Sequence, residues 1–220
     1  MKNVKLIIFD FDGTLCDTQR NIVMTLKATI AECLLPERTD EQCVSIIGLP
    51  LNECFKTLFP ELDESRIQAC AHTYRRIFAE TLADVKPLPF PNVVQTIRQL
   101  KNAGLTLSIA SSRSHASLVE LTEAMGIGDC FSLFLGADDV ERAKPNPEPV
   151  LKTLILLGFL PEETFVVGDM PVDIFMGSRA GTTTIGVSYG NSSAQDLKLA
   201  GADFVIENFS HILKVLKSNS

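Results

Sequence analysis

The strongest constraint on the fold is a short apolar run that ends in two carboxylates. Residues 4–9 read VKLIIF, and Asp10-Phe11-Asp12-Gly13-Thr14 follows directly. Such a run is typical of a strand buried on both faces of a parallel sheet. Side chains at i and i+2 of a strand share one side, roughly 6–7 Å apart, so Asp10 and Asp12 can converge where the strand ends. Converging carboxylates need a cation or a shared proton, and Gly13 lets the backbone turn and approach a ligand closely. We therefore predict a metal-assisted site at the mouth of a parallel sheet.

The composition is that of a globular chain with a sizeable core. The 220 residues are 45% apolar and 21% charged, which allows one large domain or a core with a smaller domain. The net charge of −7 argues against a general nucleic-acid surface. No apolar stretch approaches the roughly 18 residues of a membrane span, and the N-terminus lacks a signal-peptide layout. We expect a cytoplasmic protein with neither a nucleic-acid nor a membrane partner.

The six cysteines contain no C-x-x-C pair and no cysteine–histidine cluster. A zinc site is therefore not expected, and free buried thiols are. Cys16 lies just past the two aspartates, but no histidine is near it in sequence to activate a thiol nucleophile.

Residues 17–84 carry a helical pattern throughout. Apolar spacing and the breaks at Pro36, Gly48 and Pro60 predict helices before residue 36 and over 40–47, 52–58 and 64–83, with no strand among them. Prolines at 87, 89 and 91 then make a stiff connector. We predict a small helical domain, residues 17–84, inserted after the first strand.

Beyond the prolines, strands and helices alternate. Strands are expected at 105–110, 131–135, 164–167, 183–187 and 204–205, and helices at 92–103, 114–125, 146–157, 172–180 and 209–216. This alternation predicts parallel strands joined by right-handed crossovers. The predicted class is α/β, a Rossmann-like three-layer core with a parallel sheet built from residues 1–16 and 85–220.

Polar residues follow several of these strands, at the sheet edge where open α/β folds bind ligands. Besides the two aspartates of the first strand, these are Ser111-Ser112-Arg113, Lys144-Pro145, and Gly168-Asp169 with Asp173 one helical turn on. Carboxylates suit a cation, while hydroxyls and a lysine suit an anion.

These four motifs, in this order and strand context, resemble those of the haloacid dehalogenase superfamily, more narrowly its phosphoglycolate phosphatase-like branch. The resemblance spans essentially the whole chain. It implies that the helical insert is a mobile cap, so the fold expected is the Rossmann-like core plus a small helical cap domain.

The resemblance also implies a role for each motif residue. Asp10 matches the nucleophile that forms an aspartyl phosphate, and Asp12 matches the general acid/base. Ser111 matches the donor to the phosphoryl group, and Lys144 the cation that holds the charges of nucleophile and phosphate together.

The implied cofactor is Mg²⁺, which prefers hard oxygen ligands and keeps several waters. The candidate ligands are Asp10, Asp12 through its backbone carbonyl, and Asp169. Asp173 is a fourth candidate that could instead bind through water or orient Lys144.

Substrate contacts are expected from Gly13, Thr14, Ser112, Arg113 and, in the cap, Gly48 of Gly48-Leu49-Pro50. Four arginines could bind a substrate carboxylate or could equally be surface residues: Arg20, Arg75, Arg76 and Arg113.

The same resemblance separates related activities. Asp12 favours phosphoryl transfer over dehalogenation. Relatives of the β-phosphoglucomutase type place a histidine near the position of Ile22, whereas this chain has none between Asp10 and His72. Phosphonatase-like members use a cap lysine, and the surroundings of Lys56 do not resemble that motif.

Hydrolysis of a small phosphomonoester is therefore expected, by a monomer or homodimer. Phosphoglycolate is the first candidate substrate, and sugar phosphates and nucleoside monophosphates stay open. A phosphomutase of the β-phosphoglucomutase type, an inorganic pyrophosphatase and a non-catalytic phosphate-binding module are the alternatives.

Overall fold

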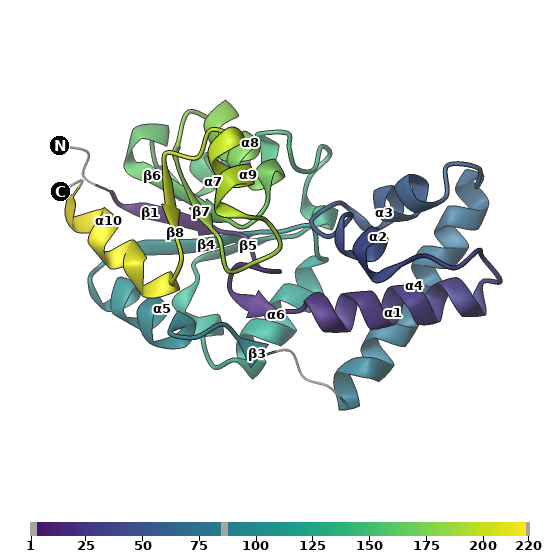
Figure 1. Ribbon diagram of the computed structural model, residues 1–220. Helices are drawn as coiled ribbons and strands as arrows, with labels where there is room; N and C mark the ends of the chain where they lie inside the picture. The colour runs from purple at the N-terminus through teal and green to yellow at the C-terminus, as the bar shows by residue number, and fades with distance from the viewer. Residues whose placement is uncertain (1–3, 85–87, 219–220) are drawn as a thin grey trace.

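The computed structural model describes residues 4–84 and 88–218. Figure 1 shows a sheet covered by helices on both faces, with a separate group of helices beside it. Both described termini lie on the sheet side, away from that group of helices.

Six parallel strands form one sheet in the order β5-β4-β1-β6-β7-β8. The strand bounds are β1 Leu6–Phe9, β4 Thr106–Ala110, β5 Leu133–Leu135, β6 Thr164–Gly168, β7 Thr183–Val187 and β8 Phe204–Ile206. The central strand β1 pairs with β4 and β6, and Phe9 lies opposite Ile109 and Val167. The carboxyl ends of these three strands are thereby aligned, so the residues that follow them share one edge of the sheet.

Helices cover both faces, as the alternating pattern predicted. Their bounds are α5 Val93–Asn102, α6 His115–Ala124, α7 Glu148–Leu157, α8 Pro171–Arg179, α9 Ala194–Leu199 and α10 Ile212–Ser218. Ile7 and Phe9 pack with α5, α6 and α10, while Leu6 and Ile8 pack with α7 and α8. The three-layer α/β fold with a parallel sheet is confirmed. Short 3₁₀ turns occur at η1 Gly128–Cys130, η2 Ala137–Asp139, η3 Pro161–Glu163 and η4 Phe209–His211.

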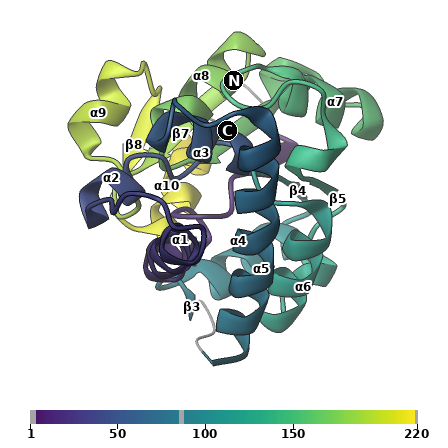
Figure 2. The same cartoon turned by 90° about the vertical axis from the view of Figure 1, so that its right-hand side faces the viewer.

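A second hydrophobic cluster belongs to the helical group, the name used here for α1 to α4. These helices are α1 Gln19–Glu32, α2 Asp40–Val44, α3 Leu51–Leu58 and α4 Glu64–Asp84. Buried residues from all four helices meet there, among them Leu26, Cys43, Phe55 and Ile67. Figure 2 looks onto this group and shows α1 and α4 side by side. None of the helices in the described part of the chain is long and apolar enough to cross a membrane.

The structure corrects the expectation that no strand lies in residues 17–84. β2 (Cys16–Asp17) pairs antiparallel with β3 (Leu88–Pro89), so the segments that enter and leave the helical group are hydrogen-bonded to each other. A two-residue ribbon is too short to carry a periodic pattern, which is why the sequence did not predict it. Part of the predicted proline connector, Pro87, lies outside the described residues.

Helix α9 was also not predicted. Ser193 starts it by accepting a hydrogen bond from the Asp196 amide at 3.2 Å, but Leu197 is its one buried residue. A single apolar position gives no helical period. Other elements agree with their predicted ranges within a few residues; β1, for example, begins at Leu6 and not at Val4.

We predict that Phe9→Ala destabilises the core by about 3–5 kcal/mol. Phe9 is fully buried, and its ring centroid lies 6.4 Å from that of Phe131 and 5.7 Å from that of Phe209. Urea denaturation measures the change. The matched control is Leu199→Ala on α9, where the side chain is 78% exposed and the expected change is within about 0.5 kcal/mol. Equal effects of the two substitutions would contradict this description of the core.

Candidate active site

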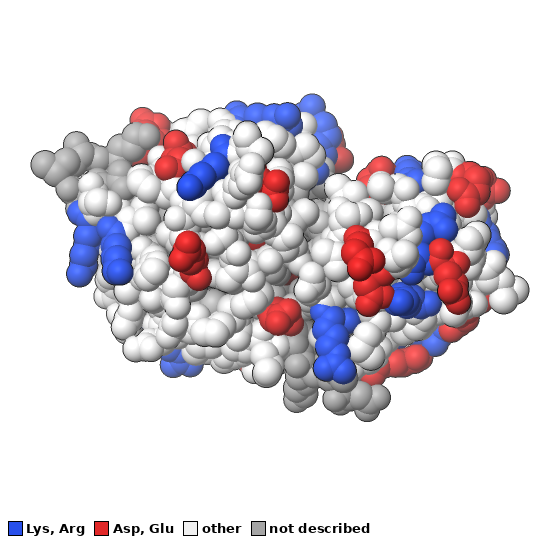
Figure 3. All heavy atoms as spheres, viewed as in Figure 1, with Lys and Arg blue, Asp and Glu red and all other residues white. Residues whose placement is uncertain are grey.

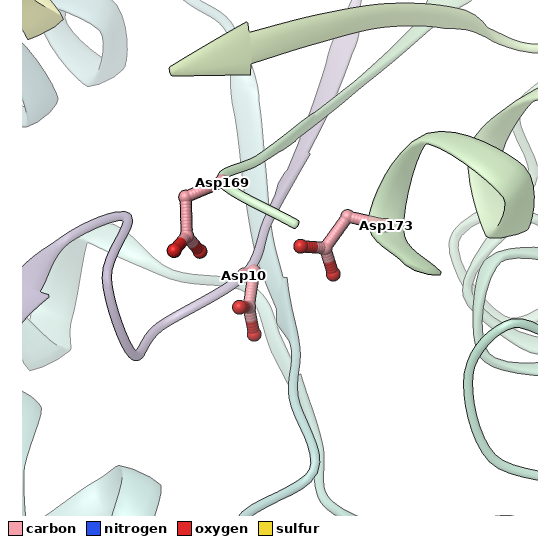
Figure 4. A group of neighbouring side chains, drawn as sticks. All are labelled: Asp10, Asp169 and Asp173. Carbon is pink, nitrogen blue, oxygen red and sulfur yellow. The ribbon is translucent and has the colours of Figure 1, made fainter. Parts of the chain in front are cut away.

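Three buried carboxylates meet at the carboxyl edge of the sheet. Asp10 follows β1, Asp169 follows β6, and Asp173 lies in the first turn of α8. One oxygen of each lies within 4.8 Å of the others, and Figure 4 shows the three side chains converging. We call Asp10, Asp169 and Asp173 the acidic triad. The sequence predicted that Asp10 and Asp169 meet at this edge, and it left Asp173 as a further candidate one helical turn on.

Lys144 supplies the positive charge beside the acidic triad. Its Nζ lies 2.5 Å from an Asp10 oxygen and 2.7 Å from an Asp173 oxygen, and its side chain is 3% exposed. Burial alone would lower the pKa of Lys144, but Asp10 and Asp173 raise it above its ordinary value. The expected proximity of Lys144 to Asp10 is therefore observed, and Lys144 also contacts Asp173, for which this was one of two roles left open.

One lysine does not balance three carboxylates. Burial, with repulsion from Asp173, Asp169 and Asp12, raises the pKa of Asp10 well above its usual range despite Lys144. Burial and Asp173 likewise raise the pKa of Asp169 to about 7, although hydrogen bonds from Asn191 and Thr14 oppose the shift. A divalent cation would offset this excess of negative charge, and carboxylate oxygens are the donors that Mg²⁺ prefers. The acidic triad therefore fits a hard divalent metal.

Asp169 is held by Asn191, which was not predicted from the sequence, and by Thr14, which was expected to contact the substrate. The backbone amide and Nδ2 of Asn191 each donate to Asp169 Oδ2 at 2.8 Å, and the Thr14 hydroxyl donates to Oδ1 at 3.0 Å. Asn191 comes from the loop that follows β7. The rule applied to the other strands, that polar residues after a buried strand face the site, would also have found this residue.

Two residues that were predicted to contact the substrate, Thr14 and Gly13, lie against Asp169. Thr14 is fully buried, its hydroxyl is used by Asp169, and its carbonyl accepts a hydrogen bond from Tyr189 at 2.8 Å. Gly13 has φ +77°, and a Cβ there would lie 2.1 Å from Asp169 Oδ2 and 2.3 Å from Asn191 Nδ2. The close approach predicted for Gly13 is thus made to protein side chains, because Asp169 and Asn191 fill the space.

Asp12 lies outside the acidic triad, contrary to the expectation that its carboxylate converges with that of Asp10. Its oxygens accept from Arg113 Nε at 2.8 and 2.9 Å, from Arg113 Nη2 at 2.8 Å and from the Thr18 hydroxyl at 2.6 Å. Backbone hydrogen bonds from the Leu15 and Cys16 amides to the Phe11 carbonyl, at 2.9 and 3.1 Å, show that the chain turns immediately after β1. The i, i+2 argument assumed that the strand continues, whereas β1 ends at Phe9.

Arg113 is a partner of this carboxylate and not a surface residue. Its side chain is 10% exposed, and its guanidinium lies 4.7 Å from the centroid of the Phe78 ring on α4. Burial lowers the pKa of Arg113, but Asp12 more than compensates and the net shift is upward. Arg113 therefore connects Asp12 to the helical group.

The remaining predicted contacts lie close to Arg113. Ser111 is buried just past β4, and its Oγ accepts from the Arg113 amide at 3.4 Å. The Ser112 hydroxyl donates to the Gly48 carbonyl at 2.7 Å, which joins the core to the loop between α2 and α3. Arg76 pairs instead with Glu32 and Glu80.

Cys16 carries no sign of a nucleophile. The residue is 1% exposed, its sulfur lies 3.4 Å from the Leu88 carbonyl oxygen, and burial, with Asp12, raises the pKa of its thiol to about 12. A thiol with so high a pKa is protonated at neutral pH.

A cavity of about 1210 Å³ lies between the sheet edge and the helical group. Asp10, Asp12, Ser111, Arg113 and Lys144 line its floor. Figure 3 shows the molecular surface notched between the two regions, with acidic and basic side chains interspersed over the helical group. The arrangement can hold a metal and an anion side by side, with Asp12 nearby to transfer a proton.

Comparison with known proteins agrees with this geometry. The profile of the haloacid dehalogenase-like hydrolase family matches residues 7–187. The chain is 36% identical over 210 residues to "Probable phosphatase IndB" of Dickeya dadantii, covering 94% of this chain and 91% of that one. It is 32% identical over 214 residues to "Pyrophosphatase PpaX" of Anoxybacillus flavithermus, covering 97% of each.

A solved structure has the same fold over nearly its full length. The crystal structure described as a predicted phosphoglycolate phosphatase from Haemophilus somnus superposes with a TM-score of 0.86 at 26% identity, covering 98% of this chain and 99% of that one. Together with the family match, this confirms the resemblance that the four motifs carry. The chain belongs to the haloacid dehalogenase-like hydrolase family.

Proposed function

We propose that this chain is a Mg²⁺-dependent phosphatase that hydrolyses a small phosphomonoester through an aspartyl phosphate on Asp10. The observation that carries the proposal is the acidic triad with Lys144 between Asp10 and Asp173, at the floor of a cavity. Family membership and relatives named as phosphatases support it. The cytoplasm is the location that we propose for this activity.

The reaction has two steps. An Asp10 oxygen attacks phosphorus, the bond from phosphorus to the alcohol oxygen breaks, and Asp12 gives that oxygen a proton. Water then attacks phosphorus of the aspartyl phosphate, Asp12 takes the proton of the water, and the Asp10 carboxylate and inorganic phosphate separate. Lys144 holds Asp10 in position, and Ser111 donates to a phosphoryl oxygen.

Asp10 and Asp169 are the proposed direct metal ligands, with the Asp12 backbone carbonyl beside them. Asp173 either completes the set or orients Lys144, which it contacts. A bound Mg²⁺ supplies Lewis-acid stabilisation of phosphoryl charge. Asn191 and Thr14 orient Asp169 for this role through the hydrogen bonds described above.

We propose residues 17–84 as the cap of the enzyme. Their helices have their own hydrophobic cluster and line the side of the cavity opposite the sheet edge. Such a cap would exclude water from the site and contact the leaving group. Besides a phosphomonoester, inorganic pyrophosphate is a candidate substrate, because a relative 32% identical to this chain is named a pyrophosphatase.

The first prediction from this proposal concerns the metal. Removing divalent metal with excess chelator should abolish phosphomonoester hydrolysis, because Lys144 alone does not offset the charge of the acidic triad. Adding Mg²⁺ back should restore activity, and calorimetry should detect Mg²⁺ binding that Asp169→Asn weakens. Full turnover in excess chelator would contradict the proposal.

The second prediction concerns the two acids of the first motif. Asp10→Asn should abolish turnover and phosphoryl labelling, because an amide does not form the acyl phosphate. Asp12→Ala should slow turnover by about 10²–10⁴-fold and leave label from a phosphoryl donor on the protein when hydrolysis is the slower step. Unchanged circular dichroism serves as the folding control. Near-normal turnover by either variant would reject its assigned role.

The third prediction concerns Arg113 as a positioning residue for Asp12. Arg113→Gln should lower kcat by up to about 10²-fold, because Asp12 loses three of its four hydrogen bonds and its position. KM should change little, because the loss is in the position of a catalytic group, whereas a purely structural role would not confine the effect to kcat. Arg113→Lys should recover part of the loss. An unchanged kcat in Arg113→Gln would reject this role.

A further inference from the structure

The cavity has very little positive charge available to bind a second anionic group of a substrate. We propose that the substrate is the phosphate monoester of an uncharged, partly apolar alcohol, such as a sugar or a nucleoside, in preference to phosphoglycolate or pyrophosphate. This inference rests on the proposed phosphatase function and narrows it to a substrate class.

The cations at the floor of the cavity are already paired. Three of the described residues that line the cavity are cationic: Arg75, Arg113 and Lys144. Lys144 contacts Asp10 and Asp173, and Arg113 makes three hydrogen bonds to Asp12. The remaining negative charge of the acidic triad is what a divalent metal would balance. The metal and Lys144 are then used by the phosphoryl group itself, and neither is left for a second anion.

The rim of the cavity is acidic. Four exposed carboxylates line it, from Glu53, Glu120, Asp138 and Glu141, and of these Glu53 is paired with Lys56 at 3.1 Å. Among the described residues that line the cavity, Arg75 on α4 is the one exposed cation against them. Charges of one sign around a cleft raise or lower the local concentration of a charged ligand. The rim therefore repels a leaving group that carries its own negative charge.

The wall that the helical group contributes is largely apolar. Ile22, Ile46, Leu49, Tyr74 and Phe78 line it, and Ile46 and Phe78 are buried. The Tyr74 and Phe78 rings stack with centroids 5.9 Å apart. Such a surface favours a leaving group with an apolar part, because that part is removed from water when it packs on the wall.

The candidate substrates differ in what their leaving groups require. Phosphoglycolate brings a carboxylate and pyrophosphate brings a second phosphoryl group, and burying either without a partner cation is costly. A sugar or nucleoside ester carries charge on its phosphoryl group alone. Its hydroxyl groups can bond to backbone and side-chain polar groups of the wall, and its ring carbons can pack on the apolar side chains.

The test compares kcat/KM at fixed pH and Mg²⁺ for a nucleoside 5′-monophosphate, a hexose phosphate, phosphoglycolate and pyrophosphate. At least one of the two uncharged-alcohol esters should be preferred over both polyanions by about tenfold or more. Equal or better hydrolysis of phosphoglycolate or pyrophosphate would overturn the inference and leave the phosphatase proposal standing. Hydrolysis of none of these, together with no phosphoryl labelling of the protein, would overturn the phosphatase proposal itself.

A pair of charge variants on one helix tests the electrostatic cause. Glu120→Lys on α6 adds positive charge to the rim and should raise kcat/KM for phosphoglycolate relative to the uncharged-alcohol esters by roughly two- to tenfold, less so at high salt. The matched control is Glu123→Lys on the same helix, at a residue that does not line the cavity. An equal change in both variants, or none in Glu120→Lys, would show that the rim charge does not set the preference.

A variant of Arg75 tests the alternative hypothesis, in which this residue binds a carboxylate of the substrate. Arg75→Gln should change the ratio of kcat/KM values for phosphoglycolate and the hexose phosphate by less than about tenfold. A larger selective loss of phosphoglycolate hydrolysis would identify Arg75 as a carboxylate-binding residue and overturn the inference.

Discussion

Burial of three carboxylates beside a single lysine is the constraint on which the rest of this structure depends. Asp10, Asp169 and Asp173 come from three separate segments, and their mutual repulsion is relieved only in part by Lys144. Burying such a cluster without further compensation would cost several kcal/mol of folding free energy. It persists because the parallel sheet aligns the ends of β1 and β6, and because the surrounding loops hold each carboxylate in place. The same deficit of positive charge favours a divalent cation, which would in turn offset the negative charge of a phosphoryl group.

The second feature of the site is the link between the sheet edge and the helical group. Arg113 contacts Asp12 on one side and the Phe78 ring on the other, and Ser112 donates to the Gly48 carbonyl. The position of the proposed acid/base is therefore coupled to the position of the helices that line the opposite wall. In the proposed enzyme, groups that contact the leaving alcohol would also influence the residue that gives it a proton.

Much of the fold could be predicted from the sequence, because its signals are local. Buried strands read as short apolar runs, and the helices between them have clear apolar faces, so the α/β class follows from their alternation. The convergence of Asp10, Asp169, Asp173 and Lys144 was also predictable, since parallel strands bring their carboxyl ends to one edge. The β2–β3 ribbon and α9 were missed because two residues, or one buried leucine, carry no periodic pattern.

The sequence could not show which side chains of the site pair with one another. Asp12 turns away from Asp10 because the strand ends at Phe9, and Thr14 turns inward to Asp169; both outcomes depend on backbone angles after β1. The pairing of Asp12 with Arg113 joins residues 101 positions apart. Asn191 also comes after a buried strand, β7, so the rule about polar residues after strand ends covers it as well. These contacts are long-range, and only the folded chain reveals them.

The central claim is that Asp10 carries the phosphoryl group during turnover. Borohydride reduces an acyl phosphate to an alcohol, so quenching the enzyme with borohydride during turnover and analysing its peptides by mass spectrometry identifies the phosphorylated residue. The account predicts conversion of Asp10 to homoserine, dependent on both substrate and Mg²⁺. Reduction at a different carboxylate, or none while phosphate is being released, would contradict it.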